Sequence, residues 1–221
     1  MPPRLVGYVE RADTDPIQSY LEAYSLGINK YRVKVGEGVS QCLGIVSKRS
    51  APPDLSRQSW LHPRLHHMLM AFGEKYVRQH IDWTSIQVNC NYVCAPHKDT
   101  GNIGESYIVA FGNFLGGQLC IEDADYNIER RGLLFDGSQH LHWTKQWSGI
   151  RYSIVFHTLK PRFPIVRPLG HYAAVKINDK WVIRYLDDNG DPQYLWKNHG
   201  LSHPLRGRKK TILNETIVSE Q

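Results

Sequence analysis

A close succession of short β-rich segments in the middle of the chain constrains the fold more than any other feature. Between residues 81 and 160, runs rich in Val, Ile, Phe, Tyr and Thr follow one another, with Gly, Asn or Asp between them. Many short strands at such close spacing are typical of an antiparallel sandwich or barrel. We therefore expect strands over residues 83–93, 106–112, 118–122, 131–135, 140–144 and 151–159.

Two segments that precede this β-rich region have helical spacing. Residues 15–26 follow the capping residues Asp13 to Asp15, and Pro16 suits a first helical position. Apolar residues recur every three or four positions over 62–80, which predicts an amphipathic helix. The stretch 47–59 is polar and contains proline, so we expect a loop there.

The length of 221 residues suits a single domain with one core. We expect a helical N-terminal support over 1–80, a jelly-roll-like β core over 81–160 and a basic C-terminal extension over 161–221. Within the extension, residues 173–177 and 180–185 flank an Asn-Asp turn and predict a hairpin. The fold class is then mainly β with flanking helices (α+β).

The positive charge of the chain lies mostly near its C-terminal end. The net charge is +6, and from Leu159 onward there are 11 basic and 6 acidic residues. This balance fits a polyanionic partner such as nucleic acid, and it fits a solvated tail equally well. Four cysteines without a C-x-x-C pair, and no signal peptide or membrane-length apolar run, predict a soluble intracellular protein of the cytoplasm or nucleus. We expect no membrane partner and, by default, a monomer.

A His-Lys-Asp run follows the first expected strand of the core. His97 and Asp99 lie two residues apart, so both can face one point if the chain turns there. One imidazole and one carboxylate make two thirds of the facial triad that binds Fe(II) and leaves positions open for a co-substrate and O2. By itself, H-x-D also occurs in strand-end turns with a solvated histidine. The downstream sequence has to decide between these interpretations.

Residues 135–158 contain the groups that would complete such a site. His140 and His142 share strand parity, so either could be the third ligand. Arg151 and Ser153 share a face in a strand of otherwise core-like residues. A buried guanidinium without an anionic partner would be costly, and a guanidinium beside a hydroxyl suits a carboxylate. A dicarboxylate that also chelates the iron is indicated, and 2-oxoglutarate fits that description.

H-x-D, a distal His and R-x-S in this order resemble the signature of Fe(II)/2-oxoglutarate dioxygenases, over about residues 85–158. The resemblance implies a double-stranded β-helix (jelly-roll) core and the cofactors Fe(II), 2-oxoglutarate and O2. The run 88–123 more narrowly resembles the TET/JBP branch, which oxidises the methyl group of pyrimidine bases in nucleic acid. The function implied is an oxidoreductase that acts on 5-methylcytosine or thymine, with DNA as the expected partner.

The same resemblance implies roles around the metal. The residues that match the ligands of the family are His97, Asp99 and His142. The spacing from His142 to Arg151 fits the short-loop members of the superfamily, and His140 stays as the alternative ligand. Arg151 and Ser153 would hold the distal carboxylate of 2-oxoglutarate, and Asn91 or Tyr92 on the preceding strand would reach the other end of that molecule.

The implied substrate contacts come from both sides of this centre. Asn102 falls where TET-type enzymes hydrogen-bond a flipped base, and His157 falls where they stack an aromatic ring on it. Phosphate contacts would come from basic residues of the extension: Arg162, Arg167, Lys176, Arg206, Arg208, Lys209 and Lys210. A protein or small-molecule hydroxylase, similar to prolyl hydroxylases, is the alternative function. A binding module without chemistry is a third hypothesis, which the complete ligand set argues against.

Overall fold

The computed structural model describes residues 1–27, 36–47, 53–160, 173–177, 180–186 and 192–195, whose strands form three antiparallel sheets. The large sheet has seven strands in the order β1 (Arg4–Tyr8), β8 (Arg131–Phe135), β5 (Asn102–Gly116), β10 (Trp147–Leu159), β4 (Ser85–Cys94), β2 (Gly36–Val46) and β3 (Asp54–Leu55). A second sheet has the order β7 (Ala124–Tyr126), β6 (Leu119–Ile121) and β9 (His142–Thr144). The third has the order β11 (Ala173–Ile177), β12 (Lys180–Leu186) and β13 (Pro192–Leu195).

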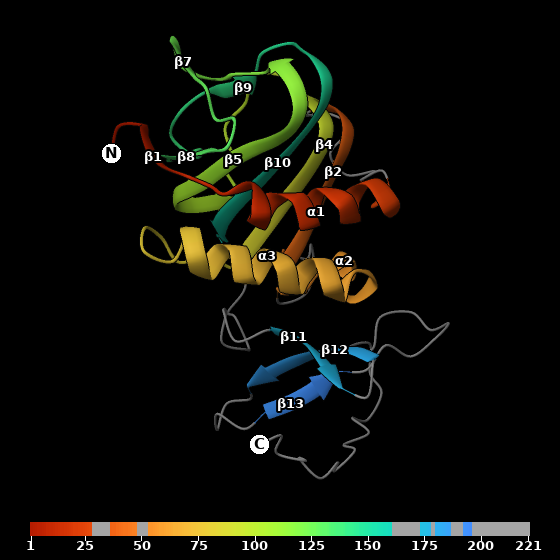
Figure 1. The fold of residues 1–221 in the computed structure, drawn as a ribbon. Helices are drawn as coiled ribbons and strands as arrows, with labels where there is room; N and C mark the ends of the chain where they lie inside the picture. The colour runs from red at the N-terminus through yellow and green to blue at the C-terminus, as the bar shows by residue number, and fades with distance from the viewer. Residues whose placement is uncertain (28–35, 48–52, 161–172, 178–179, 187–191, 196–221) are drawn as a thin grey trace.

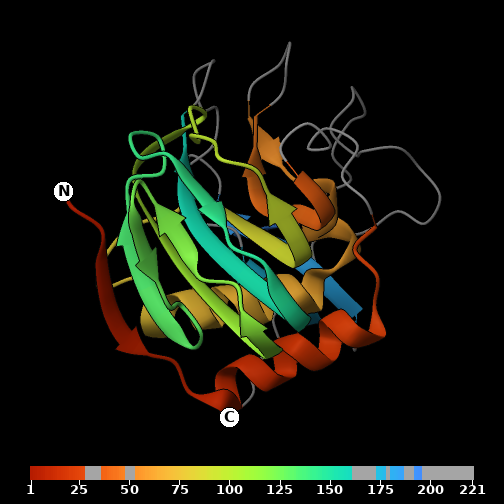
Figure 2. The ribbon, with the colours of Figure 1, turned by 90° about the horizontal axis from the view of Figure 1, so that it is seen from above.

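The helices and the second sheet cover opposite faces of the large sheet. Helices α1 (Arg11–Ala23) and α3 (Pro63–Tyr76) lie across one face, as Figures 1 and 2 show, and the short α2 (Arg57–Leu61) precedes α3. One apolar cluster joins these helices to the sheet, and it includes Leu69 and Phe72 of α3. A smaller cluster joins the large sheet to β6. The large sheet is therefore buried on both faces.

Strand β10, near the middle of the large sheet, supplies different chemistry to each face. Alternate residues Tyr152, Ile154 and Phe156 belong to the cluster under the helices. The residues between them point to the opposite face, where Arg151 meets aromatic rings that belong to or pack against the smaller cluster. Arg151, Tyr152, Ser153, Ile154 and Phe156 are all buried, so one strand carries both an apolar face and a polar face.

The expected fold class is confirmed, and each of the six predicted core strands has a counterpart in β4, β5, β6, β8, β9 and β10. Besides its three helices, the predicted helical support over 1–80 also contains the strands β1, β2 and β3. β1 joins one edge of the large sheet, and β2 pairs with β4 over eight residue pairs. The short strand β7 was also not predicted. β1 and β2 were missed because their stability comes from pairing partners far along the chain, which local patterns do not report.

The start of α1 differs from its prediction. The helix begins at Arg11, with Glu10 as its N-cap, and Pro16 lies inside it rather than at its first position. Tertiary contacts set this start, because the backbone N–H of Val9 donates to Arg130 and that of Glu10 donates to the Tyr76 hydroxyl. Helix α3 is confirmed, whereas part of the predicted loop forms β3 and α2.

The predicted hairpin in the C-terminal extension is confirmed as the antiparallel pair β11 and β12. Of the basic residues predicted to contact phosphate, only Lys176 lies in a described segment, within β11; the others lie outside the described residues. All four cysteines are free thiols. Among the described residues, no helix is long and apolar enough to cross a membrane.

Candidate metal and co-substrate site

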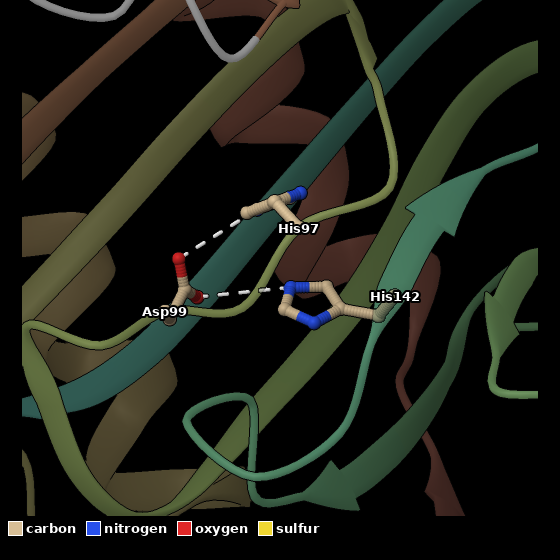
Figure 3. A group of neighbouring side chains, drawn as sticks. All are labelled: His97, Asp99 and His142. Carbon is tan, nitrogen blue, oxygen red and sulfur yellow. Dashed lines mark ion pairs between the residues drawn. The ribbon is translucent and has the colours of Figure 1, made fainter.

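Three side chains converge where the chain leaves β4 and where it enters β9. One ligand atom from each of His97, Asp99 and His142 lies within 4.8 Å of the others. Figure 3 shows the carboxylate of Asp99 facing both imidazoles: Oδ1 is 3.6 Å from Nε2 of His97, and Oδ2 is 3.8 Å from Nε2 of His142. Two atoms that bind one ion at about 2.1 Å each lie about 3 to 4 Å apart. The cluster therefore has the size that a single metal ion needs.

Both imidazoles are oriented by backbone carbonyl groups. Nδ1 of His97 is 2.8 Å from the carbonyl oxygen of Ala95, and Nδ1 of His142 is 2.9 Å from that of His140. A carbonyl oxygen only accepts, so each Nδ1 must carry the proton and donate it. Each Nε2 is then left as a lone-pair donor that faces the Asp99 carboxylate. Such fixed tautomers are typical of histidines that bind metals.

Backbone hydrogen bonds hold the three residues together. His97 and His142 exchange both N–H to carbonyl bonds, at 3.1 and 3.0 Å, as an isolated antiparallel bridge. The N–H of Asp99 donates to the carbonyl of Gly137 at 2.8 Å. A Cβ on Gly137 would lie 3.3 Å from Oδ2 of Asp99 and 3.3 Å from Cε1 of His142, so this glycine leaves room for both side chains. The geometry is therefore set by the backbone.

The two candidate third ligands have different surroundings. His142 is 5% exposed and belongs to the cluster, with its ring edge-on to Phe135 at 5.0 Å between centroids. Nδ1 of His140 instead lies 3.8 Å from a carboxylate oxygen of Glu122. Although the two histidines share strand parity, β9 begins only at His142, and His140 belongs to the turn before it. The structure thus brings His142, and not His140, to the other two residues.

Arg151 lies on the polar face of β10 and is 3% exposed. Its Nε and Nη2 are buried and make no hydrogen bond within the described part of the chain. The guanidinium carbon lies 5.5 Å from the ring centre of Phe114 and 5.6 Å from that of Trp147. Burial away from water lowers the pKa of Arg151 to about 10, which leaves the group charged at neutral pH. The fold thus holds a buried cation whose Nε and Nη2 lack an acceptor among the described residues.

Glycine at position 117 makes room for this cation. A Cβ there would lie 2.9 Å from both Cδ and Nε of Arg151, and the backbone φ of +68° disfavours other residues. A glycine between two strands usually marks a turn. Gly117 also shapes the guanidinium pocket, a role that only the tertiary contact reveals.

Ser153 lies two residues beyond Arg151 on the same face and is also 3% exposed. Its hydroxyl accepts a hydrogen bond from the side-chain amide of Asn89 at 3.1 Å. Asn91, predicted to contact the co-substrate, is exposed, and its side-chain oxygen accepts from the backbone N–H of Arg151 at 2.8 Å. The amide beside Ser153 is therefore that of Asn89, which the sequence did not single out.

The two predicted substrate residues lie toward the other end of β10. Asn102 pairs with Leu159, and His157 pairs with Ser85 of β4. Asn102 is half-buried, its N–H donates to the carbonyl of Asp99 at 2.9 Å, and its carboxamide has no hydrogen bond to the described residues. His157 is 9% exposed. Asn102 is therefore close in the fold to the segment that carries the cluster.

A separate cavity of about 410 Å³ lies away from this site, between α1 and β5. Its lining is polar and includes Arg11, Gln18 and Arg130, but none of the three cluster residues. Nη2 of Arg130 donates to the carbonyl of Val9 at 3.1 Å, so this arginine holds the residues just before α1 in place. The cavity follows from the way the helix meets the sheet, and volume alone does not locate the chemistry of this protein.

No family model matches the chain, and no curated protein matches it in sequence. Among solved structures, NgTET1 in complex with 5mC DNA is 16% identical over 66% of this chain and 68% of that one, with a TM-score of 0.46. An oxidoreductase of the 2OG-Fe(II) oxygenase family from Burkholderia pseudomallei is 16% identical over 70% of this chain and 84% of that one, with a TM-score of 0.43. A Pseudomonas putida prolyl-4-hydroxylase is 10% identical over 72% of this chain and 92% of that one, with a TM-score of 0.44. Similarity this low assigns no function to the chain, so the function has to be inferred from the side chains of the site.

Proposed function

We propose that the protein is an Fe(II)- and 2-oxoglutarate-dependent dioxygenase. The observation that carries this proposal is the buried guanidinium of Arg151, whose Nε and Nη2 find no acceptor among the described residues. It lies in the same fold as a cluster of two imidazoles and one carboxylate, the ligand set of Fe(II) oxygenases with open positions. A co-substrate with a carboxylate for the arginine and a chelating 2-oxo acid for the metal satisfies both features.

Each residue of the chain then has a defined task. His97, Asp99 and His142 would hold the metal through two neutral nitrogens and one oxygen, a ligand set that leaves positions open for the co-substrate and O2. Arg151 and Ser153 bind the distal carboxylate by charge-assisted hydrogen bonds in a site that excludes water. When bound, the iron and 2-oxoglutarate supply the oxidation: O2 is split between succinate and the substrate, and CO2 is released. The protein contributes the orientation of the two reacting partners.

As the substrate we propose the methyl group of a 5-methylpyrimidine in nucleic acid, with DNA as the first candidate. Asn102 supports this choice, because its carboxamide is half-buried, has no partner within the described segments and follows Asp99 by three residues. An amide offers a donor and an acceptor, which suits the Watson–Crick edge of a flipped base. His157 would stack on that base. Two exposed lysines, Lys98 and Lys160, lie beside the same segment and would meet phosphates.

Mass spectrometry of nucleosides tests the proposal directly. Methylated DNA is incubated with the protein, Fe(II), 2-oxoglutarate and O2, and loss of 5-methylcytosine with gain of oxidised products is the expected result. Succinate should form in step with the oxidised base. If succinate forms only with protein or small-molecule substrates, the chain is a dioxygenase of the alternative kind. If no substrate and no condition yields succinate, the dioxygenase proposal fails.

Asn102→Ala separates base recognition from a simple turn role. We expect oxidation of methylated DNA to fall about tenfold to a hundredfold, as for a lost pair of base contacts. Substrate-free decay of 2-oxoglutarate and the melting temperature should stay close to those of the parent. Asn113→Ala is the matched control, because Asn113 is exposed at the far end of the same strand. A parallel fall of stability and of both activities would make Asn102 a turn residue.

A further inference from the structure

A hydrogen-bonded row of polar side chains crosses three neighbouring strands of the large sheet and ends at Ser153. Nε2 of Gln87 donates to Oγ of Ser40 at 2.9 Å, and that hydroxyl donates to Oδ1 of Asn89 at 2.6 Å. Nδ2 of Asn89 donates to Oγ of Ser153 at 3.1 Å. Ser40, Asn89 and Ser153 are directly paired across β2, β4 and β10, so strand register puts them in line.

The direction of this row has a consequence for Ser153. Because its oxygen accepts from Asn89, its own proton is free to be donated elsewhere. The amide of Asn89 is held in this orientation by Ser40, whose oxygen already accepts from Gln87 and whose proton goes to Oδ1 of Asn89. If the amide were reversed, its oxygen would face Ser153 and would take the hydroxyl proton. The row therefore controls whether Ser153 acts as a donor.

A carboxylate ligand needs this donor state, because an ionised carboxylate only accepts hydrogen bonds. Ser40, Gln87 and Ser153 are 1%, 8% and 3% exposed, so water competes little for these groups. Arg151 presents unmet donors two residues along the same face of β10. Asn89, which links Ser40 to Ser153, is half-buried. A row of largely buried polar groups on one face of a sheet is expensive to build for stability alone. Its orientation toward one hydroxyl points to a ligand.

We propose that Gln87, Ser40 and Asn89 form a positioning relay that presents the Ser153 hydroxyl as a donor to the distal carboxylate of the co-substrate. This inference rests on the dioxygenase function proposed above and extends the co-substrate site to residues of β2 and β4. None of the three relay residues acts on the reacting atoms. They set the affinity for 2-oxoglutarate through Ser153.

Asn89→Asp tests the relay with almost no change of shape, because it replaces the donor Nδ2 by an oxygen that only accepts. Binding of 2-oxoglutarate to the Mn(II)-loaded protein is measured by calorimetry, and KM and kcat are measured with Fe(II). We expect the dissociation constant and KM for 2-oxoglutarate to rise about tenfold to a hundredfold, as for a lost charge-assisted hydrogen bond. The kcat at saturating 2-oxoglutarate and the Mn(II) affinity should change less than about twofold. Ser40→Ala should give a smaller rise of about three- to tenfold.

A shorter ligand makes the test specific for the distal carboxylate. 2-Oxobutyrate keeps the chelating 2-oxo acid and lacks the distal carboxylate, so its weak binding should be the same in the parent and in Asn89→Asp. Gln41→Glu is the matched control for a buried amide replaced by an acid, because Gln41 is next to Ser40 and donates to the carbonyl of Gly27 instead. It should leave the affinity for 2-oxoglutarate unchanged.

The failures of the two proposals can be told apart. If the parent protein loaded with Mn(II) does not bind 2-oxoglutarate, both the dioxygenase function and the relay are wrong. If the parent binds it and Asn89→Asp binds it equally well, the relay alone is wrong. If Asn89→Asp weakens 2-oxobutyrate as much as 2-oxoglutarate, or lowers Mn(II) affinity in parallel, Asn89 has a structural role and the relay is again wrong.

Discussion

Strand β10 is buried on both of its faces, and the two faces differ in their chemistry. On β10, Tyr152, Ile154 and Phe156 point to the helices, whereas Arg151 and Ser153 point to the other side, and none of the five is more than 3% exposed. The helix side is closed by apolar packing. On the other side, a guanidinium keeps unmet donors in the part of the chain that the structure describes. Burial by itself therefore does not distinguish a core from a site.

The difference lies in what each face does with its side chains. Apolar groups on the helix side contribute free energy simply by leaving water. A buried charge without a partner costs free energy, so a fold keeps one where a ligand will complete it. The comparison predicts that substitutions on the helix side change stability, and that substitutions on the polar side change ligand binding. Four experiments test it, in order of expected effect.

The largest effect should come from the third metal ligand, His142. His142→Ala removes one of three ligands and should abolish Fe(II)-dependent turnover, with a loss of metal affinity of at least about a hundredfold. His140→Ala is the matched control, because its imidazole faces Glu122 and not the cluster. It should retain metal binding, as measured by calorimetry with Mn(II). Equal losses in the two variants would contradict the ligand assignment.

Two adjacent residues of β10 compare the faces most directly. Ile154→Ala leaves a cavity under the helices and should lower the free energy of unfolding by about 2–5 kcal/mol in urea denaturation. Metal binding by the folded fraction should persist. Ser153→Ala should lower stability by less than about 1 kcal/mol and instead weaken 2-oxoglutarate binding. If the destabilised variant were Ser153→Ala, the assignment of the two faces would be reversed.

His66 gives the helix side its own pH dependence. It lies on α3 and is 1% exposed, and burial, with a smaller contribution from His67, lowers the pKa of His66 from 6.5 to about 4. Between these pH values the unfolded chain binds a proton here that the folded chain does not. The free energy of unfolding should thus fall by about 3 kcal/mol as the pH falls from 6.5 to 4.

Urea denaturation at several pH values measures this fall. His66→Gln should flatten the profile over that window, and the exposed neighbour His67→Gln should leave most of the slope in place. A slope that persists unchanged in His66→Gln would assign the acid sensitivity to other groups.

The smallest of the four effects concerns the guanidinium of Arg151. Arg151→Lys keeps a positive charge and loses the planar pair of donors. We expect the apparent 2-oxoglutarate requirement to rise about tenfold to a hundredfold, about 1.4 to 2.8 kcal/mol of binding, with little change in urea stability. Calorimetry on the Mn(II)-loaded variant measures the change. An unaltered requirement would place the carboxylate elsewhere.

Much of the candidate site could be predicted from local sequence. His97 and Asp99 lie two apart after a strand, and Arg151 and Ser153 lie two apart within one, so local spacing alone puts each pair on a common face. The choice between His140 and His142 could not be predicted from strand parity, because both have the same parity. It depends on where β9 begins and on Glu122, which is 18 residues before His140.

By itself, the sequence determined the antiparallel β core and the chemical types of the site, because periodicity and side-chain chemistry are local properties of the chain. Tertiary structure alone decided which residues meet. β1 and β2 complete the large sheet through partners far along the chain. Asn89 reaches Ser153 only through the register of β4 against β10, and Gly117 meets Arg151 only because β5 pairs with β10. Register and packing are set by the free energy of the whole fold, so no local pattern contains them.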